Sequence, residues 1–181
     1  MDSIEHGYYV EKDTLQLMAE NQVAWVPTIS PVAAGAANSL FKDGSGQSSG
    51  LLEKICEEYI EKLRFALHSG VILEAGSDAG APGVRHGPGL IAEMSMYARG
   101  ALSNRFILRA ATAANAQIVG LDGDMGAIRC GLKPELIAMR GNPLHDLAAL
   151  KQVQMRFSTG HYSGAEERTF SGREGLIQGS M

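Results

Sequence analysis

The sequence predicts an α/β fold in which short parallel strands alternate with helices along the first 121 residues. Three observations lead to this prediction. The short apolar run at residues 22–28 suits a strand that is buried on both faces, as in a parallel sheet. Longer segments on either side of it repeat apolar residues at helical spacing. Glycine is abundant, with 22 residues, and it stands where strands and helices of such a fold end.

The composition is that of a globular protein and excludes several classes. The apolar fraction of 45% rules out a disordered chain, and 181 residues suffice for one domain or for part of a larger one. The net charge of −4 without a basic block argues against a nucleic-acid partner. No apolar run is long enough to span a membrane, and the N-terminus has no signal-peptide pattern. Cys56 and Cys130 lack metal or redox spacing, so we expect two small buried hydrophobes and a cytoplasmic protein.

The first elements follow from local patterns. Residues 2–6 are expected to end a strand. Residues 10–21 carry the apolar spacing of a helix, and residues 22–28 form the next strand. The segment from Ser30 to Gly50 is rich in Ala, Gly and Ser and is expected to be a loop. A loop of this length is typical of a functional lid or flap.

The strongest helical pattern covers residues 51–69, where an apolar stripe runs along one side of the helix and charged residues lie on the solvent side. Residues 71–78 predict another strand, and a loop rich in glycine and proline follows it. Two more helices are expected over residues 90–100 and 104–118, with Ser103 as the cap of the second. The repeated order of strand and helix predicts parallel βα units over residues 1–121.

The pattern changes after residue 121. Short strands at residues 136–139 and 153–157, with a tight turn and a helical turn between them, predict a small β-module over residues 122–160. Residues 161–181 are mostly glycine, serine and charged side chains. We expect this last segment to be a disordered tail.

Two strand-end motifs, Ser3-Ile4-Glu5-His6-Gly7 and Gly76-Ser77-Asp78-Ala79-Gly80, contain the candidate chemical groups. Parallel α/β enzymes place their active sites at the carboxyl ends of strands. A carboxylate at Asp78 could bind a divalent metal and take a proton from water, although it could also cap a helix or a turn. A neutral imidazole at His6 could ligate zinc, although a lone histidine in such a position is more often structural.

Four further residues or segments raise functional questions. His86, in the loop after the second motif, could contact substrate or be solvated. Glu5 and Glu74 lie within apolar strands, and buried carboxylates need partners, so we expect a salt bridge for each. The glycine-rich residues 79–83 lack the spacing and the lysine of a phosphate-binding loop, which argues against a nucleotide site.

Taken in order, the motifs resemble the C-terminal half of the amidohydrolase superfamily, in its imidazolonepropionase and Xaa-Pro dipeptidase-like branch. The two strand-end motifs resemble the ends of that family's sixth and eighth barrel strands, and Val26-Pro27-Thr28 resembles the seventh. The resemblance covers about residues 2–160. Four later segments follow in the family's order: Arg85-His86-Gly87 through Glu93, Ala110 through Leu121, Gly126-Ala127-Ile128 with Gly131, and Gly141-Asn142-Pro143-Leu144-His145-Asp146.

The resemblance implies strands 6 to 8 of a TIM-type (β/α)8 barrel in residues 1–121 and part of a small β-sandwich domain in residues 122–160. It implies one or two divalent metals, usually zinc, and hydrolysis of C–N bonds in an amide, dipeptide or cyclic amide. Asp78 would be the metal-binding general base. His6 would be a metal ligand or a substrate-facing residue, and His86 would contact the small-molecule substrate.

The family's other ligands, a His-x-His pair, a bridging lysine or glutamate and a fifth-strand histidine, stand upstream of the segments that match. Two ligands are fewer than the three that a catalytic zinc site uses. We therefore expect a truncated chain that is inactive alone. It could pair with a separate N-terminal polypeptide, be insoluble by itself, or be a fragment of a longer protein, and a homo-oligomer stays open. The alternatives are a non-catalytic partner or regulatory module on the same scaffold and a nucleotide-binding α/β domain.

Overall fold

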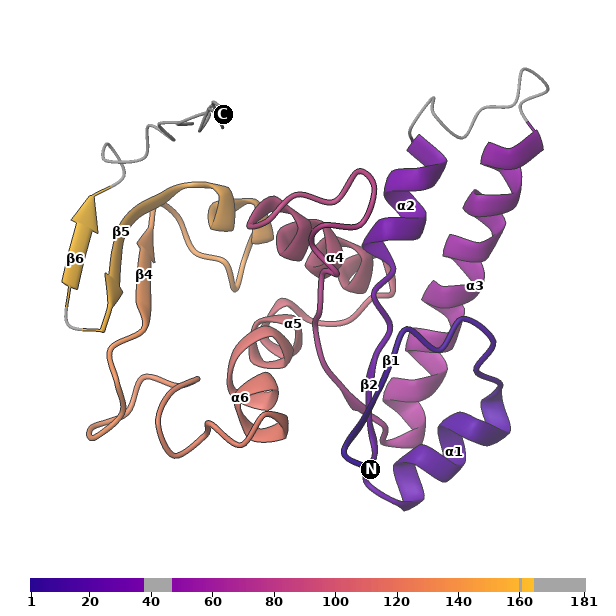
Figure 1. Ribbon diagram of the computed structural model, residues 1–181, viewed down its shortest axis with the longest axis horizontal. Helices are drawn as coiled ribbons and strands as arrows, with labels where there is room; N and C mark the ends of the chain where they lie inside the picture. The colour runs from indigo at the N-terminus through magenta and orange to yellow at the C-terminus, as the bar shows by residue number, and fades with distance from the viewer. Residues whose placement is uncertain (38–46, 160, 165–181) are drawn as a thin grey trace, which may run out of the picture.

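The computed structural model describes residues 1–37, 47–159 and 161–164, and it contains two three-stranded sheets with helices between them. Figure 1 shows β4–β6 on one side of the molecule, α4–α6 in the middle, and β1 and β2 with α1–α3 on the other side. Among the described residues, no helix has the length and apolar character needed to cross a membrane.

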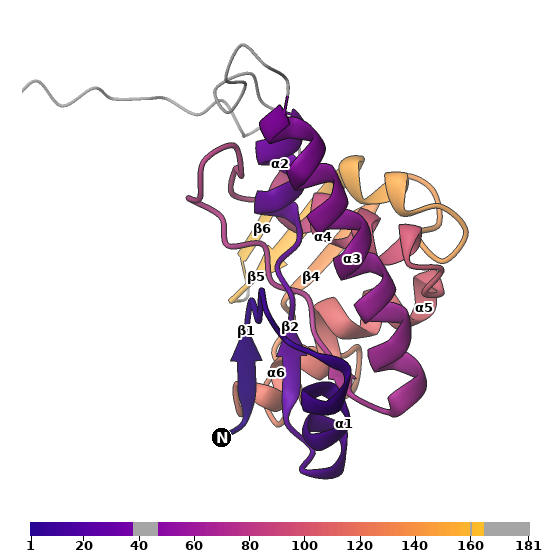
Figure 2. The same cartoon turned by 90° about the vertical axis from the view of Figure 1, so that its right-hand side faces the viewer.

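The first sheet is parallel, as the sequence predicts. It consists of β1 (Ser3–Glu5), β2 (Ala24–Val26) and β3 (Ile72–Leu73) in the order β1-β2-β3. Both pairings are parallel, because the helices α1 (Lys12–Glu20) and α3 (Gln47–Ser69) carry the chain back to the start of the next strand. Figure 2 shows β1 and β2 side by side.

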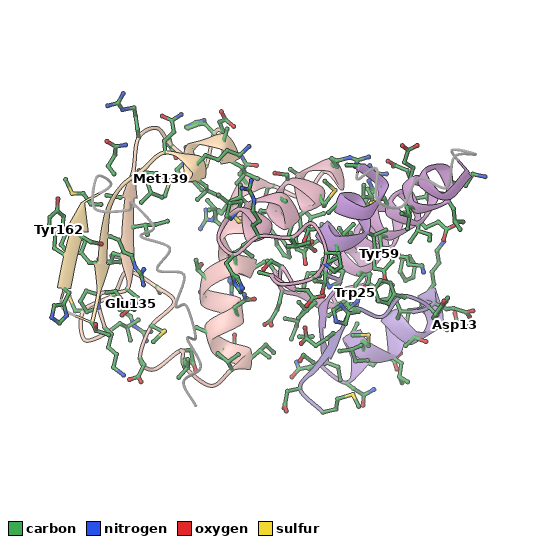
Figure 3. The ribbon with its side chains drawn as sticks, turned by 45° about the horizontal axis from the view of Figure 1, so that its top comes forward. Asp13, Trp25, Tyr59, Glu135, Met139 and Tyr162 are labelled. Atoms are coloured by element: carbon green, nitrogen blue, oxygen red, sulfur yellow. The ribbon has the colours of Figure 1, made fainter. Side chains whose placement is uncertain are left out.

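The main core lies between this sheet and the helices α1 and α3. Trp25 of β2 is fully buried and stacks on Tyr59 of α3, with ring centroids 6.1 Å apart. These two residues lie together in Figure 3. Leu15 and Leu63 are also fully buried in this cluster, and Leu73 of β3 packs into it. One face of the sheet is therefore closed by apolar packing.

The predicted loop from Ser30 to Gly50 is wrong over much of its length. Residues Ser30–Ala37 form the helix α2, and α3 begins at Gln47. The rest of the predicted loop, residues 38–46, lies outside the described residues. The small side chains of α2 allow it to pack against α3. At its start, the N–H groups of Ile29 and Ser30 donate hydrogen bonds to the carboxylate of Glu93, which is distant in the sequence. Neither contact is visible in the local sequence.

The helices after β3 differ from the prediction in one detail. The helix α4 (Pro88–Arg99) forms as expected, but the predicted helix over 104–118 is divided. It consists of α5 (Asn104–Arg109), the π-helical turn η2 (Ala110–Ala114) and α6 (Asn115–Ile118). Ser103 caps α5 as predicted, because its hydroxyl accepts a hydrogen bond from the N–H of Phe106.

The second sheet is antiparallel, with strands β4 (Leu136–Met139), β5 (Val153–Ser158) and β6 (His161–Gly164) in that order. The 3-10 helix η3 (Leu147–Lys151) lies between β4 and β5. The disordered tail predicted for residues 161–181 is wrong for residues 161–164. They pair with β5, where Tyr162 stands opposite Phe157 with ring centroids 5.5 Å apart. Residues 165–181 lie outside the described residues.

The two cysteines lie in different environments. Cys56 of α3 is buried, as predicted, but Cys130 is exposed, so the prediction of a second buried thiol is wrong. Cys130 stands in the turn region that precedes β4, where none of residues 121–135 is buried. Both thiols are free.

Candidate active site

The carboxyl ends of the three parallel strands share an unusual backbone conformation. His6 follows β1, Thr28 follows β2, and Asp78 follows β3, and their φ angles are 62°, 55° and 48°. This left-handed region is unfavourable for residues other than glycine, and it often occurs at functional sites. Because the strands are parallel, their carboxyl ends share one edge of the sheet. The structure therefore brings His6 and Asp78 to the same edge.

Several contacts hold His6 at the end of β1. Its N–H donates a 2.8 Å hydrogen bond to the carbonyl of Val26, and its own carbonyl accepts a 3.0 Å hydrogen bond from the indole of Trp25. Its ring stacks on Tyr8, with centroids 5.6 Å apart and planes 4° apart. Nδ1 of His6 is buried and has no hydrogen-bond partner among the described residues. This nitrogen is therefore available to a ligand that the chain itself does not provide.

Asp78 is exposed in the loop after β3, and its carbonyl accepts a hydrogen bond from the N–H of Ala81. The pKa of the Tyr8 phenol indicates which charged groups lie near it. Partial burial raises the pKa of Tyr8, and the negative charges of Asp78 and Glu93 raise that pKa further. Tyr8 thus stacks on His6 and also lies within the electrostatic influence of Asp78. These three side chains form what we call the strand-end cluster.

The third predicted site residue, His86, stands apart. It is exposed in the turn that leads into α4, where the N–H of Gly89 donates to the carbonyl of Arg85. The ring of His86 has no hydrogen-bond partner within the described part of the chain. The structure gives no contact between His86 and the strand-end cluster, so its role in substrate contact stays a prediction.

Glu93 is a residue that sequence reasoning missed. It is fully buried in α4, where its carboxylate accepts hydrogen bonds from the main-chain N–H groups of Ile29 (3.0 Å) and Ser30 (2.6 Å). Burial raises the pKa of Glu93 to about 7, although these hydrogen bonds lower it. It joins α4 to the chain just after the end of β2. The available signal was a charged residue on the apolar stripe of a helix, next to Met94 and Tyr97.

The salt bridges expected for Glu5 and Glu74 are absent from the described residues. Glu5 is exposed, and its carboxylate accepts a hydrogen bond from the hydroxyl of Ser3. Glu74 is only 3% exposed, and its Oε1 has no hydrogen-bond partner. Burial, and to a lesser degree the charge of Glu5, raises the pKa of Glu74 to about 7. The sheet presents no cation at this position to pair with either carboxylate.

The residues present fit a metal only in part. His6 offers a buried, unpartnered nitrogen, and Asp78 offers an exposed carboxylate at the same sheet edge. Within residues 1–37, 47–159 and 161–164, no group of three or more His, Cys, Asp or Glu side chains could hold a metal ion. A catalytic zinc needs at least three protein ligands. The strand-end cluster could therefore supply two ligands to a metal but could not complete its site.

Comparisons with known proteins show what this chain is similar to. Residues 1–162 match the sequence pattern of the amidohydrolase family. An ochratoxinase from Aspergillus niger is 27% identical over 154 residues, which are 83% of this chain and 30% of that protein.

Two solved structures are also similar to this chain over most of its length. A Xaa-Pro dipeptidase with bound methionine in its active site has a TM-score of 0.76 and 26% identity, over 91% of this chain and 40% of that one. The A. niger ochratoxinase structure has a TM-score of 0.74 and 26% identity, over 92% of this chain and 38% of that one. These similarities confirm the predicted α/β class. The chain spans well under half the length of the relatives that it matches.

Proposed function

Because the chain belongs to the amidohydrolase family, we propose that it supplies one part of the active site of a metal-dependent hydrolase that cleaves amide or related C–N bonds. In this proposal β1, β2 and β3 correspond to strands 6, 7 and 8 of a (β/α)8 barrel of the Xaa-Pro dipeptidase-like branch. The antiparallel strands β4–β6 belong to its small β-sandwich domain. The parallel strand order and the similarity to a Xaa-Pro dipeptidase and an ochratoxinase support it.

The observation that carries the proposal is the position of His6 and Asp78 at one edge of the parallel sheet. The unpartnered Nδ1 of His6 supports a metal ligand at this position, because a buried nitrogen without a partner is unfavourable unless a ligand satisfies it. The left-handed backbone at both residues adds local strain of the kind that active sites contain.

The residues of this chain would have distinct roles. His6 and Asp78 would hold the metal, which when bound supplies a Lewis acid for water and for the scissile carbonyl. Asp78 is exposed, so its carboxylate can accept a proton from the attacking water and return it to the leaving nitrogen. Tyr8 stacks on His6 and is exposed enough to contact a substrate side chain. The further ligands that a zinc site requires would come from polypeptide outside these 181 residues.

Reconstitution tests the proposal. The chain alone, supplied with zinc, is expected to show no turnover of Xaa-Pro dipeptides or cyclic amides. Mixed with an amidohydrolase N-terminal polypeptide from the same genome that carries the His-x-His pair, it is expected to become active. Asp78→Asn should then lower kcat by about 100-fold or more, because proton transfer by a positioned carboxylate contributes that much.

Asp13→Asn, an exposed change on α1 away from the strand ends, is the matched control and should leave the reconstituted activity unchanged. Zinc-dependent turnover by the chain alone would contradict the shared active site. Equal activity of the Asp78→Asn and wild-type mixtures would contradict the role of Asp78.

A second candidate is a non-catalytic partner or regulatory module that keeps the amidohydrolase scaffold. The presence of only two candidate ligands among the described residues favours it. The same mixture separates the two candidates. A regulatory module should bind the N-terminal polypeptide and change its behaviour without any dependence on Asp78.

A further inference from the structure

We propose that Glu74 and Glu5 form an acceptor site for a guanidinium or ammonium group at the end of an aliphatic side chain. The side chain belongs to a polypeptide strand that pairs with the open edge of β1. This inference rests on the proposed function, in which more of an amidohydrolase packs against this chain, and it identifies the chemistry of that contact.

The two carboxylates face a large cavity on the side of the sheet opposite the main core. Ile4, Trp25 and Leu73 pack toward α1 and α3, and alternate residues of a strand point to opposite faces. Glu5, Glu74 and their neighbours line a cavity of about 880 Å³. Its lining includes Glu5 and Glu74, Asn115 from α6, Ile128 from the following turn region, and Leu136 from β4.

Glu74 is the group that requires a ligand. It is 3% exposed, and its Oε1 is buried without a hydrogen-bond partner. The nearby hydroxyl of Tyr97 donates to the main-chain carbonyl of Glu74 and not to its carboxylate. A buried charge without a partner is strongly unfavourable, whereas a cation beside it removes most of that penalty.

The charged groups around Glu74 do not neutralise it. Glu5 from β1 adds negative charge beside Glu74. The carboxylates of Glu93, Glu74 and Glu5 together raise the pKa of the neighbouring Tyr97. Arg109 and Glu135 also line the cavity, and because their charges are opposite they leave Glu5 and Glu74 unbalanced. The ion pairs among the described residues join other side chains, Arg99 with Glu57 and Lys133 with Asp124. The cavity is therefore an acidic site whose charge is not balanced by these residues.

The strand order identifies where the cation would come from. In the order β1-β2-β3, β1 has a neighbour on one side only. Just after β3, the main-chain N–H and carbonyl of Ala75 are already occupied, because the amide of Asn115 bonds both. A strand added beside β1 would lie next to Ser3 and Glu5, at the entrance of the cavity. The apolar side chains of the lining would contact an aliphatic stem, and the two carboxylates would contact its charged end.

Arginine and citrulline peptides test the proposal, because citrulline has the shape of arginine without its charge. The probes are the capped strand peptide Val-Thr-Val-Arg-Val-Thr-Val, its citrulline counterpart, and N-acetyl-arginine amide as a free cation. We expect the arginine peptide to bind the wild-type chain with saturation at pH 8, and at least about ten times more tightly than the citrulline peptide. Glu74→Gln should reduce its affinity to that of the citrulline peptide.

Two controls make the result interpretable. Glu58→Gln removes the same charge from the exposed face of α3 and should leave binding unchanged. The carboxyl carbon signal of Glu74 in the wild-type chain gives a second readout that needs no variant. Its pKa should fall when the arginine peptide is added and should not change with the citrulline peptide.

Equal binding of the two peptides, or unchanged binding by Glu74→Gln, would overturn the proposal. If N-acetyl-arginine amide binds as tightly as the arginine peptide, the site takes a free organic cation and the strand source is wrong. The readout is binding at Glu74, so a negative result leaves the assignment of His6 and Asp78 standing. Conversely, loss of the hydrolase proposal would leave this binding measurement unaffected.

Discussion

The carboxylate of Glu93 accepts a 2.6 Å hydrogen bond from the main-chain N–H of Ser30, a residue 63 positions earlier in the chain. Its other oxygen accepts a bond from the N–H of Ile29. Glu93 lies in α4, which follows the loop that carries Asp78, whereas Ser30 begins α2 just beyond the end of β2. One buried side chain therefore ties together the segments that follow two neighbouring strand ends of the candidate site.

Replacement of Glu93 by alanine is expected to destabilise the fold by about 2–4 kcal/mol, because two buried N–H donors lose their acceptor and a void remains. Glu93→Gln keeps one acceptor oxygen and most of the volume, so it should cost about half as much. Urea denaturation measures both variants. Glu58→Gln on α3 is the exposed control, and an alanine variant as stable as this control would contradict the structural role of Glu93.

The stability of the chain is expected to fall as pH rises from about 5 to 7. The pKa values of Glu74 and Glu93 are raised from 4.5 to about 7 in the folded chain, so the folded state binds more protons than the unfolded state in this interval. Each group can then lower the free energy of unfolding by up to about 1.4 kcal/mol per pH unit.

Glu74→Gln removes one of these two groups and should reduce the slope of stability against pH. Urea denaturation at several pH values between 5 and 8 measures this slope. Since the glutamine carries no charge, the variant should also exceed the wild-type stability at pH 8. Parallel curves for the variant and the wild type would show that Glu74 titrates normally.

Loss of the Asn115 amide is expected to weaken the attachment of α6 to the parallel sheet. Its side chain donates a 2.8 Å hydrogen bond to the carbonyl of Ala75 and accepts a 3.3 Å bond from the N–H of Ala75. Asn115→Ala leaves both main-chain groups without this partner and should cost about 1–3 kcal/mol in thermal or urea denaturation. Gln117→Ala, an exposed change on the same helix, should be close to neutral.

Gly126→Ala should be more damaging than Gly123→Ala, although both residues stand in the same turn region. Gly126 has a φ of +98°, and a Cβ there would meet the Cβ of Ala116 at 2.5 Å. We expect a loss of about 2–4 kcal/mol from backbone strain and overpacking. A Cβ at Gly123 meets no atom within 4 Å, so that variant should differ little from the wild type. Equal stability of the two variants would contradict the close packing of this turn against α6.

The sequence predicted the elements whose evidence is local. The apolar runs predicted β1, β2 and β3, although β3 covers only Ile72–Leu73 of the predicted residues 71–78. Helical spacing predicted α1, α3 and α4 close to their observed bounds. It did not predict α2, because the N-terminus of that helix is bonded by Glu93 and its side packs on α3. Nor did it predict β6, whose partner strand β5 determines its conformation.

Residues of the candidate site were likewise predicted only where the evidence is local. The strand-end motifs identified His6 and Asp78 because a polar residue after an apolar strand is a local pattern. Glu93 was missed because its partners are Ile29 and Ser30, far away in the sequence. For Glu74 the sequence showed an acidic residue in an apolar strand, and this residue is buried. The salt bridge expected for it was wrong.

By itself, the amino-acid order determined the α/β class, the parallel arrangement of the first strands and the positions of two metal-competent side chains at strand ends. These properties follow from hydrophobic periodicity and turn residues, which act over a few neighbouring positions. Only the tertiary structure decided that Nδ1 of His6 and Oε1 of Glu74 are buried without partners. The burial and pairing of a polar atom depend on every segment that folds around it, and most of those segments are distant along the chain.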